Sequence, residues 1–175
     1  MLKPIPVVLS SYDPKWPARA EALSKKLLAL GPYMIKTHHI GSTSVPGLVA
    51  KPIIDMMVVV TDLHVLDQDR LFVEALGFKW HGEFGIEGRR FCTLTAQDGA
   101  RVSHLHFFQK NSPHVAANLV FRDYLRAHPS VARAYEREKR RAQNLQPNDT
   151  VAYSKEKAAW IERTLTKALQ WHTHL

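Results

Sequence analysis

One segment of this sequence combines residue types that bind phosphate with a carboxylate in apolar surroundings. Residues 38–60 read HHIGSTSVPGLVAKPIIDMMVVV. Their central loop consists of Gly41, Ser42, Thr43 and Ser44. Its backbone N–H groups and three hydroxyls are the groups of a phosphate-binding loop. Asp55 follows in an apolar run, where an ionised carboxylate must be paired, bind a metal ion or lie at the open end of a strand. The alternative is a structural Asp55 that is satisfied by backbone amides, by Lys51 or by an arginine.

Two histidines offer a second set of candidate ligands. The segment SHLHFF places His104 and His106 two residues apart, so a strand puts both on one face. If that strand lies beside the strand of Asp55, the three side chains form a cluster of two imidazoles and one carboxylate. This set suits zinc, manganese or iron better than magnesium, which prefers oxygen ligands. Alternatively, both histidines only make hydrogen bonds within the sheet. His38 and His39, just before the loop, are a weaker pair of candidates.

Positively charged groups close to these segments could hold an anionic ligand. Arg89 and Arg90 begin a strand, and one of them could bind a phosphate with two hydrogen bonds while strand alternation points the other away. Lys51 precedes Asp55 by four residues and could pair with it or with a ligand. Tyr153 and Lys157 lie four residues apart on one helix face, where they form either a surface pair or a contact to phosphate or base.

Composition narrows the class of protein. The chain has 175 residues, of which 45% are hydrophobic, and 24 Lys and Arg stand against 16 Asp and Glu. This length suits one domain with a sizeable core, and no apolar run approaches the ~20 residues of a membrane span. The run EREKRRAQ at 136–143 is typical of a solvated helix face. It lacks interleaved aromatic residues, so nucleic acid is not the favoured partner. The single cysteine, Cys92, excludes an internal disulfide, and we expect a cytoplasmic protein.

The apolar periodicity predicts an α+β domain with a helical C-terminal tail. We expect the α+β part over 1–110 and the tail over 111–175, in one unit. The expected strands lie at 4–9, 33–40, 52–60, 78–84, 89–95 and 101–108. The expected helices lie at 14–30, 66–77, 113–127, 129–145 and 149–171, the first with Asp13 as its N-cap and Pro14 at its first position.

A Gly-Ser pair, a spacer of about ten residues and an acid on the following strand together resemble the signature of the nucleotidyltransferase superfamily. More closely, the chain resembles the GrpB family, which shares that fold. The resemblance covers nearly all of residues 7–165. The segments that carry it are YDPKW, HIGSTSVPGLVAKPIID, GRRF, HLHFF, FRDYLRAHP, and the late Tyr153 with Lys157.

The resemblance implies a nucleotidyltransferase-like mixed β-sheet that binds a phosphorylated small molecule, with a nucleotide as the first candidate. It implies phosphate at Ser42 and Thr43 and a divalent ion (Mg, Mn or Zn) at Asp55, for nucleotidyl or phosphoryl transfer by metal-assisted displacement. The second acid expected two residues later is replaced by Met57. Two alternatives therefore remain: a degenerate, non-catalytic module that binds a ligand or a partner, and a metal-dependent hydrolase that uses His104, His106 and Asp55.

Overall fold

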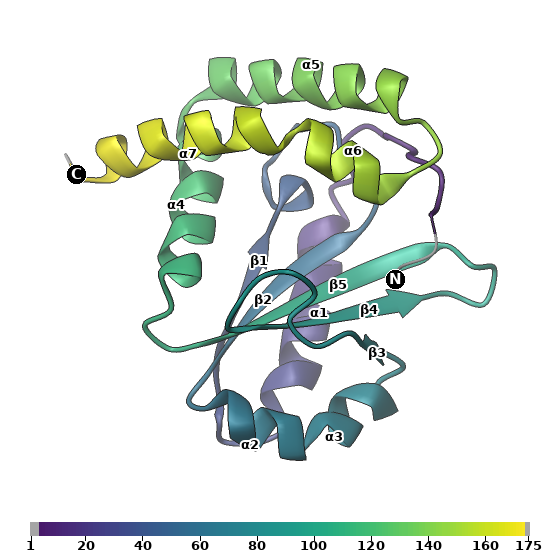
Figure 1. Ribbon diagram of the computed structural model, residues 1–175, viewed down its shortest axis with the longest axis vertical. Helices are drawn as coiled ribbons and strands as arrows, with labels where there is room; N and C mark the ends of the chain where they lie inside the picture. Colours follow the sequence, from purple (N-terminus) through teal and green to yellow (C-terminus); the bar gives the residue numbers. More distant parts are fainter. Residues whose placement is uncertain (1–3, 174–175) are drawn as a thin grey trace.

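The structure, a computed structural model, describes residues 4–173. Five strands form one mixed sheet in the order β1-β2-β5-β4-β3, as Figure 1 shows. The strands are β1 (Met34–Ile40), β2 (Ile54–Val60), β3 (Lys79–Trp80), β4 (Arg89–Thr95) and β5 (Arg101–Gln109). The α-helices are α1 (Trp16–Leu28), α2 (Leu63–Gln68), α3 (Arg70–Ala75), α4 (Pro113–Ala127), α5 (Pro129–Leu145), α6 (Thr150–Glu156) and α7 (Ala158–His172). A short 3₁₀ turn, η1, spans Ser42–Ser44. No helix within residues 4–173 is long and apolar enough to cross a bilayer.

The strand that carries Asp55 is an interior strand, as the sequence predicts. β2 pairs with β1 in antiparallel orientation and with β5 in parallel orientation. In this register Asp55 lies opposite Ile40 of β1 and opposite His104 of β5. Asp55 is the second residue of β2, so it lies at the end of the strand that receives the loop containing η1.

Strand alternation divides the sheet into two faces of different character. One face of β2 and β5 carries Met56, Val58, Leu105 and Phe107, which belong to the main hydrophobic core. That core also contains the buried side chains of α1, α2 and α3. The opposite face carries Asp55, His104 and His106, as predicted. Further along the same face, Met57 and Phe108 are buried with Ile40 against α4. We call the face that carries Asp55, His104 and His106 the site face. It is covered by apolar side chains at one end and polar at the other.

The last three helices lie together at one end of the sheet (Figure 1), opposite α2 and α3. A smaller core fixes them there, since Val45 and Leu48 of the loop after η1 pack with Leu125 of α4 and Tyr135 of α5. The predicted α+β class with a helical C-terminal part is confirmed. The helical part covers the polar end of the site face, so it contributes side chains to the candidate site.

The N-terminal predictions were wrong in two respects. Residues 4–9 form no strand, because Pro4 and Pro6 have no N–H to donate to a sheet. Instead the Val7 N–H donates to the Pro147 carbonyl at 2.7 Å, which holds this segment against the C-terminal helices. The first helix begins at Trp16 rather than at residue 14, since Asp13 accepts the Lys15 N–H in a turn at 2.8 Å.

Three further elements are shorter or broken. The helix expected at 66–77 is two short helices that meet at Asp69, and the helix expected at 149–171 is broken at Lys157. The strand expected at 78–84 comprises only Lys79 and Trp80. Positive φ angles at Gly82, Phe84 and Gly85 turn the chain out of the sheet there.

Candidate functional site

The loop that precedes β2 is built to lie against Asp55. Gly41 has φ +69°, and a Cβ at this residue would lie 2.6 Å from Asp55 Oδ2. The Ser44 hydroxyl donates to the Gly41 carbonyl at 2.6 Å and closes the η1 turn. The Ser44 carbonyl in turn accepts two hydrogen bonds from Arg126 of α4. Ser44 therefore holds the turn and, unlike Gly41 and Ser42, does not line the cavity described below.

Thr43 ties the loop to the start of β2. Its buried Oγ1 lies 3.3 Å from the Ile53 carbonyl, to which it donates, and 2.9 Å from Nε2 of His39. Because the hydroxyl proton goes to the carbonyl, Thr43 Oγ1 accepts from His39 Nε2–H. Burial lowers the pKa of His39 to about 4, so this imidazole is neutral near pH 7. His39 is thus a support for the loop, and both Ser42 and Thr43 line the cavity, although the Thr43 hydroxyl is engaged by Ile53 and His39.

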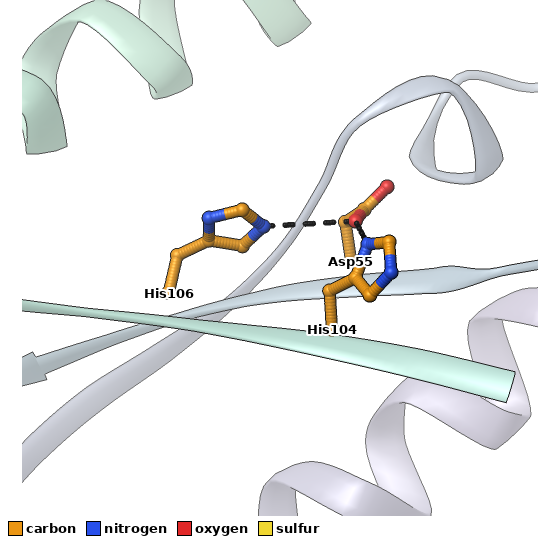
Figure 2. Close-up of side chains that lie close together, drawn as sticks. All are labelled: Asp55, His104 and His106. Carbon is orange, nitrogen blue, oxygen red and sulfur yellow. Dashed lines mark hydrogen bonds and ion pairs between the residues drawn. The ribbon is translucent and has the colours of Figure 1, made fainter. Parts of the chain in front are cut away.

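Asp55, His104 and His106 converge, as Figure 2 shows. His104 Nδ1 lies 2.9 Å from Asp55 Oδ1, and His106 Nε2 lies 3.6 Å from the same oxygen. Burial alone would raise the pKa of Asp55, but the two imidazoles outweigh it and hold the pKa below its ordinary value. Asp55 is therefore ionised near pH 7. One ligand atom from each residue lies within 4.8 Å of the others, close enough for a single metal ion.

The neighbours of His106 affect its ability to bind a metal ion. Arg89 Nη1 lies 3.5 Å from His106 Nδ1. A guanidinium only donates, so Nδ1 accepts, and the proton of the neutral ring is on Nε2, which faces Asp55. A metal-bound histidine normally donates its other N–H to an acceptor, whereas here the other nitrogen faces a donor. The donor set of His104, His106 and Asp55 fits a divalent ion such as zinc or manganese, but binding through His106 Nε2 requires Arg89 to move.

The two consecutive arginines have separate roles. Arg89 is buried, and its Nε and Nη2 donate to the carbonyls of Glu83 and Phe84 at 3.2 Å and 2.7 Å. Arg90 points to the other side of the sheet, where Nε and Nη2 hold both oxygens of Asp67 at 2.6 Å and 2.7 Å. Arg89 lines the cavity, and Arg90 does not. Of the two predicted phosphate ligands, only Arg89 lies at the cavity. There it also anchors the loop that contains Glu83 and Phe84.

A cavity of about 830 Å³ lies over the polar end of the site face. This volume is in the range of small-molecule and cofactor sites. Its wall includes the loop residues Gly41, Ser42 and Thr43 together with Asp55, His104 and His106. Basic side chains outnumber acidic ones in the wall. The basic ones are Lys51, Arg89, Arg101, Lys139, Lys155 and Lys157, and the acidic ones are Asp55 and Glu162.

Three of these lysines meet two tyrosine rings, in what we call the lysine–tyrosine cluster: Lys51, Lys139, Lys157, Tyr135 and Tyr153. Lys157 Nζ lies 4.1 Å from the centre of the Tyr153 ring and 5.8 Å from that of Tyr135. Lys51 lies over Tyr153 at 5.1 Å, and Lys139 lies over Tyr135 at 4.9 Å. The ring faces attract the ammonium groups, and Lys139 also donates to the Val49 carbonyl.

The cluster concentrates positive charge away from water. Lys139 and Lys157 are 1% and 9% exposed. Burial, and then repulsion from Lys157, lowers the pKa of Lys139 to about 7 and that of Lys51 to about 8. Burial also lowers the pKa of Lys157 to about 8. Within residues 4–173, none of these three lysines forms an ion pair with a carboxylate. An anion is the partner that would complete this cluster.

The sequence predictions missed two of the five residues of this cluster. Lys139 and Tyr135 fall in and beside the run at 136–143 that was assigned to a solvated helix face, and for Lys139 that assignment was wrong. Tyr153 and Lys157 are adjacent as their spacing predicts, but they are buried, so they are not a surface pair. A signal for all four was present. YEREK at 135–139 and YSKEK at 153–157 repeat one pattern, Tyr-x-x-Glu-Lys.

The replacement at residue 57 is also clear in the structure. Met57 is fully buried and packs with Ile40 and Phe108. It lies opposite His106 in β5 and does not line the cavity. Asp55 is therefore the single carboxylate next to the two histidines among the described residues, and the wall's other acid, Glu162, is on exposed α7 surface.

Comparison with solved structures defines the type of fold. The fold matches that of Cid1 poly(U) polymerase, in a structure bound to MgATP, with a TM-score of 0.51 and 14% identity. The match covers 74% of this chain and 45% of the polymerase. This chain thus has a nucleotidyltransferase-like fold, as predicted.

A family model and closer relatives make the assignment specific. The chain belongs to the GrpB protein family, whose model matches residues 6–167. The crystal structure of GrpB from Enterococcus faecalis has a TM-score of 0.87 and 34% identity, over 94% of this chain and 99% of that one. UPF0157 protein YqkA of Bacillus subtilis is 36% identical over 161 residues, which are 91% of this chain. The chain spans 46% of the length of YqkA.

Proposed function

We propose that this protein binds a phosphorylated small molecule, of the nucleotide class, in the cavity over Asp55. The observation that carries the proposal is the lysine–tyrosine cluster, in which three ammonium groups converge without a carboxylate partner among the described residues. Burying a charge is unfavourable unless it is paired. A phosphate at this position pairs with all three lysines, and Ser42 of the adjacent loop donates a further hydrogen bond. Cid1 poly(U) polymerase, which shares the fold, has been crystallised with MgATP.

The test uses a change that separates ligand binding from stability. Replacing Lys157 by Met removes a buried charge and keeps an unbranched chain of similar volume. We expect Lys157→Met to unfold at the same or a higher temperature than the natural protein, because the charge is no longer desolvated. Its affinity for ATP and for tripolyphosphate should fall by about tenfold or more. Both ligands are titrated by calorimetry, and unfolding is followed by circular dichroism.

Lys167→Met is the matched control. Lys167 is exposed on α7 and does not line the cavity, so its removal lowers the net charge equally without touching the site. Affinity for both ligands should stay within about twofold of the natural value. Equal losses in the two variants would show that binding follows net charge rather than the cluster. An absence of binding to every phosphate compound tested would overturn the proposal itself.

Nucleotidyl or phosphoryl transfer is a further part of this proposal, and the geometry supports transfer less than it supports ligand binding. Two-metal displacement needs carboxylates that bridge two ions, and residue 57 supplies none. A single divalent ion held by Asp55 next to the bound phosphate is compatible with the site. Binding without transfer, as in a degenerate member of the nucleotidyltransferase class, requires only the residues already described. A search for nucleotidyl or phosphoryl transfer with Mg²⁺ and Mn²⁺ separates these two forms of the proposal.

A metal-dependent hydrolase is the second candidate, because Asp55, His104 and His106 could hold one ion. The ion would supply an activated water or polarise a phosphate oxygen. The measurement is metal content and calorimetric affinity for Zn²⁺ and Mn²⁺ in the natural protein and in the His104→Ala, His106→Ala double variant. Loss of metal only in the double variant supports this candidate. Equal metal uptake by both proteins, with phosphate binding lost in the variant, rejects the metal role and keeps the cavity.

A further inference from the structure

The loop between β3 and β4 holds an aromatic side chain in an unfavourable backbone conformation. Phe84 has φ +46°, and it follows Gly82 and precedes Gly85, which also have positive φ. Non-glycine residues adopt this region at a cost, and such residues cluster at functional sites. Neighbouring contacts enforce the conformation. Arg89 Nη2 donates to the Phe84 carbonyl at 2.7 Å, and the Gly88 N–H donates to Glu83 Oε1 at 2.8 Å.

The conformation brings the Phe84 ring to the cavity. Phe84 lines the cavity and is 38% exposed. It stacks on Phe91 of β4 with ring centres 5.3 Å apart and planes inclined by 24°. Phe91 is buried and also contacts the rings of His104 and His106 at 5.3 Å and 5.2 Å. The Phe84 ring is thus supported from behind by a packed aromatic layer, while part of it is open to the cavity.

This aromatic wall and the lysine–tyrosine cluster are built from different elements of the structure. Phe91 is in β4, which is two strands from β2 and hence roughly 10 Å away across the sheet. Lys51 lies three residues before the start of β2, and the other lysines of the cluster come from α5 and the junction of α6 with α7. Phe91 lies opposite His106 in the register of β4 and β5, whereas Lys51 precedes Asp55 by four residues. The cavity wall therefore combines a planar apolar surface with concentrated positive charge.

We infer that Phe84 is the stacking surface for a planar heterocyclic ring of the ligand, whose phosphates bind the lysine–tyrosine cluster. This inference rests on the proposed function and narrows its ligand class to phosphates that carry a heterocycle, such as nucleoside triphosphates. Stacking between a base and an aromatic side chain is worth about 1–3 kcal/mol and tolerates any base. Phe84 therefore favours nucleotides over ring-free phosphates but discriminates little between purines and pyrimidines.

The test compares two nucleoside triphosphates, which differ in the ring, with a triphosphate that has no nucleoside. ATP, UTP and tripolyphosphate are titrated calorimetrically into the natural protein, Phe84→Ala and Phe84→Trp. We expect the natural protein to bind both nucleotides about tenfold or more tightly than tripolyphosphate. Phe84→Ala should lose this preference while its affinity for tripolyphosphate stays unchanged. Phe84→Trp should retain the preference, since a larger ring still stacks.

Phe72→Ala is the control, because Phe72 is an exposed phenylalanine of α3 that does not line the cavity. It should bind all three compounds like the natural protein. Phe84→Ala that still prefers nucleotides would overturn the inference, and so would an equal loss of affinity for nucleotides and tripolyphosphate. Both results leave the proposed function standing as long as Lys157→Met weakens tripolyphosphate binding. If the natural protein binds none of the three compounds, the proposed function fails and this inference fails with it.

Discussion

Gly41 lies directly against the carboxylate of Asp55. A Cβ at residue 41 would lie 2.6 Å from Asp55 Oδ2 and 3.1 Å from Asp55 Cβ. Real Cβ atoms do not approach other atoms this closely. The absence of a side chain at residue 41 therefore allows the loop to lie directly against the Asp55 carboxylate. The positive φ of Gly41 adds a second reason for glycine, because it is unfavourable for other residues.

Gly41→Ala should be more destabilising than the same change at Gly47. Gly47 also has positive φ, +75°, but no atom lies within 4 Å of its added Cβ. We expect Gly47→Ala to lower the free energy of unfolding by about 1–2 kcal/mol, which is the backbone cost alone. Gly41→Ala should add about 1–3 kcal/mol for overpacking against Asp55. Urea denaturation of both variants measures the difference.

A double-mutant cycle shows whether contact with Asp55 causes the additional destabilisation by Gly41→Ala. In an Asp55→Ala background the 2.6 Å approach to Oδ2 is absent and only the 3.1 Å approach to the Cβ of residue 55 remains, so Gly41→Ala should cost little more than Gly47→Ala. A coupling energy of about 1 kcal/mol or more between residues 41 and 55 is expected. If the two substitutions have additive effects on the free energy of unfolding, the added Cβ at residue 41 causes no strain against Asp55.

Asp55→Asn should abolish binding of divalent ions while the fold stays intact. The change is nearly isosteric, and the new amide oxygen still accepts from His104 Nδ1, so mainly the charge is lost. Asp67→Asn is a suitable control, because Asp67 pairs with Arg90 outside the cavity. Calorimetric titration with Mn²⁺ and Zn²⁺ provides the comparison. Unchanged metal affinity would count against a ligand role for Asp55, and loss of folding would point to a structural one.

Stability and phosphate binding should depend on pH in opposite directions. In the folded protein the pKa is about 7 for Lys139 and about 8 for Lys51 and Lys157, against an ordinary value of 10.5. Between about pH 7 and pH 10 the unfolded chain binds more protons, so the free energy of unfolding should rise with pH. Phosphate affinity should fall over the same interval, because the lysines lose their charge.

Lys157→Met tests whether the lowered pKa of Lys157 contributes to this pH dependence of stability. It removes one of the three buried ammonium groups, so the rise of stability between pH 7 and pH 10 should become shallower. Urea denaturation at several pH values gives the slope for both proteins. A slope identical to that of the natural protein would mean that Lys157 titrates normally in the folded state.

Arg89→Lys should loosen the loop at 82–88, whereas Arg90→Lys should not. Lysine cannot reproduce the guanidinium that donates to both the Glu83 and the Phe84 carbonyls. Amide hydrogen exchange of residues 82–88 should therefore become faster in Arg89→Lys. Arg90→Lys affects mainly the bidentate pair with Asp67 on the other side of the sheet, and the contact of Arg90 Nη1 with Glu83 Oε1 is a longer pair at 3.7 Å, so exchange in this loop should change much less. Equal acceleration in both variants would refute the anchoring role of Arg89.

The sequence by itself determined which residues share a face. The period of two in a strand places His104 with His106 and separates both from Leu105 and Phe107, whatever the sheet looks like. Apolar neighbours on both sides of Asp55 indicated an interior strand, since only a strand covered on both faces can be apolar throughout. The motif at 39–55 identified the GrpB family, and with it the nucleotidyltransferase-like fold.

Only the tertiary structure decided which charged residues are buried. Lys139 and its neighbours Arg140 and Arg141 belong to one charged run, yet Lys139 is 1% exposed while both arginines lie at the surface. Helix periodicity says that these residues point in different directions, but the face that meets the cavity is fixed by the packing of Tyr135 against Val45 and Leu48. Those partners are about ninety residues away in sequence. Local pattern therefore specified the strands of the site and the acid, whereas long-range contacts assembled the lysines, the tyrosines and Phe84 around them.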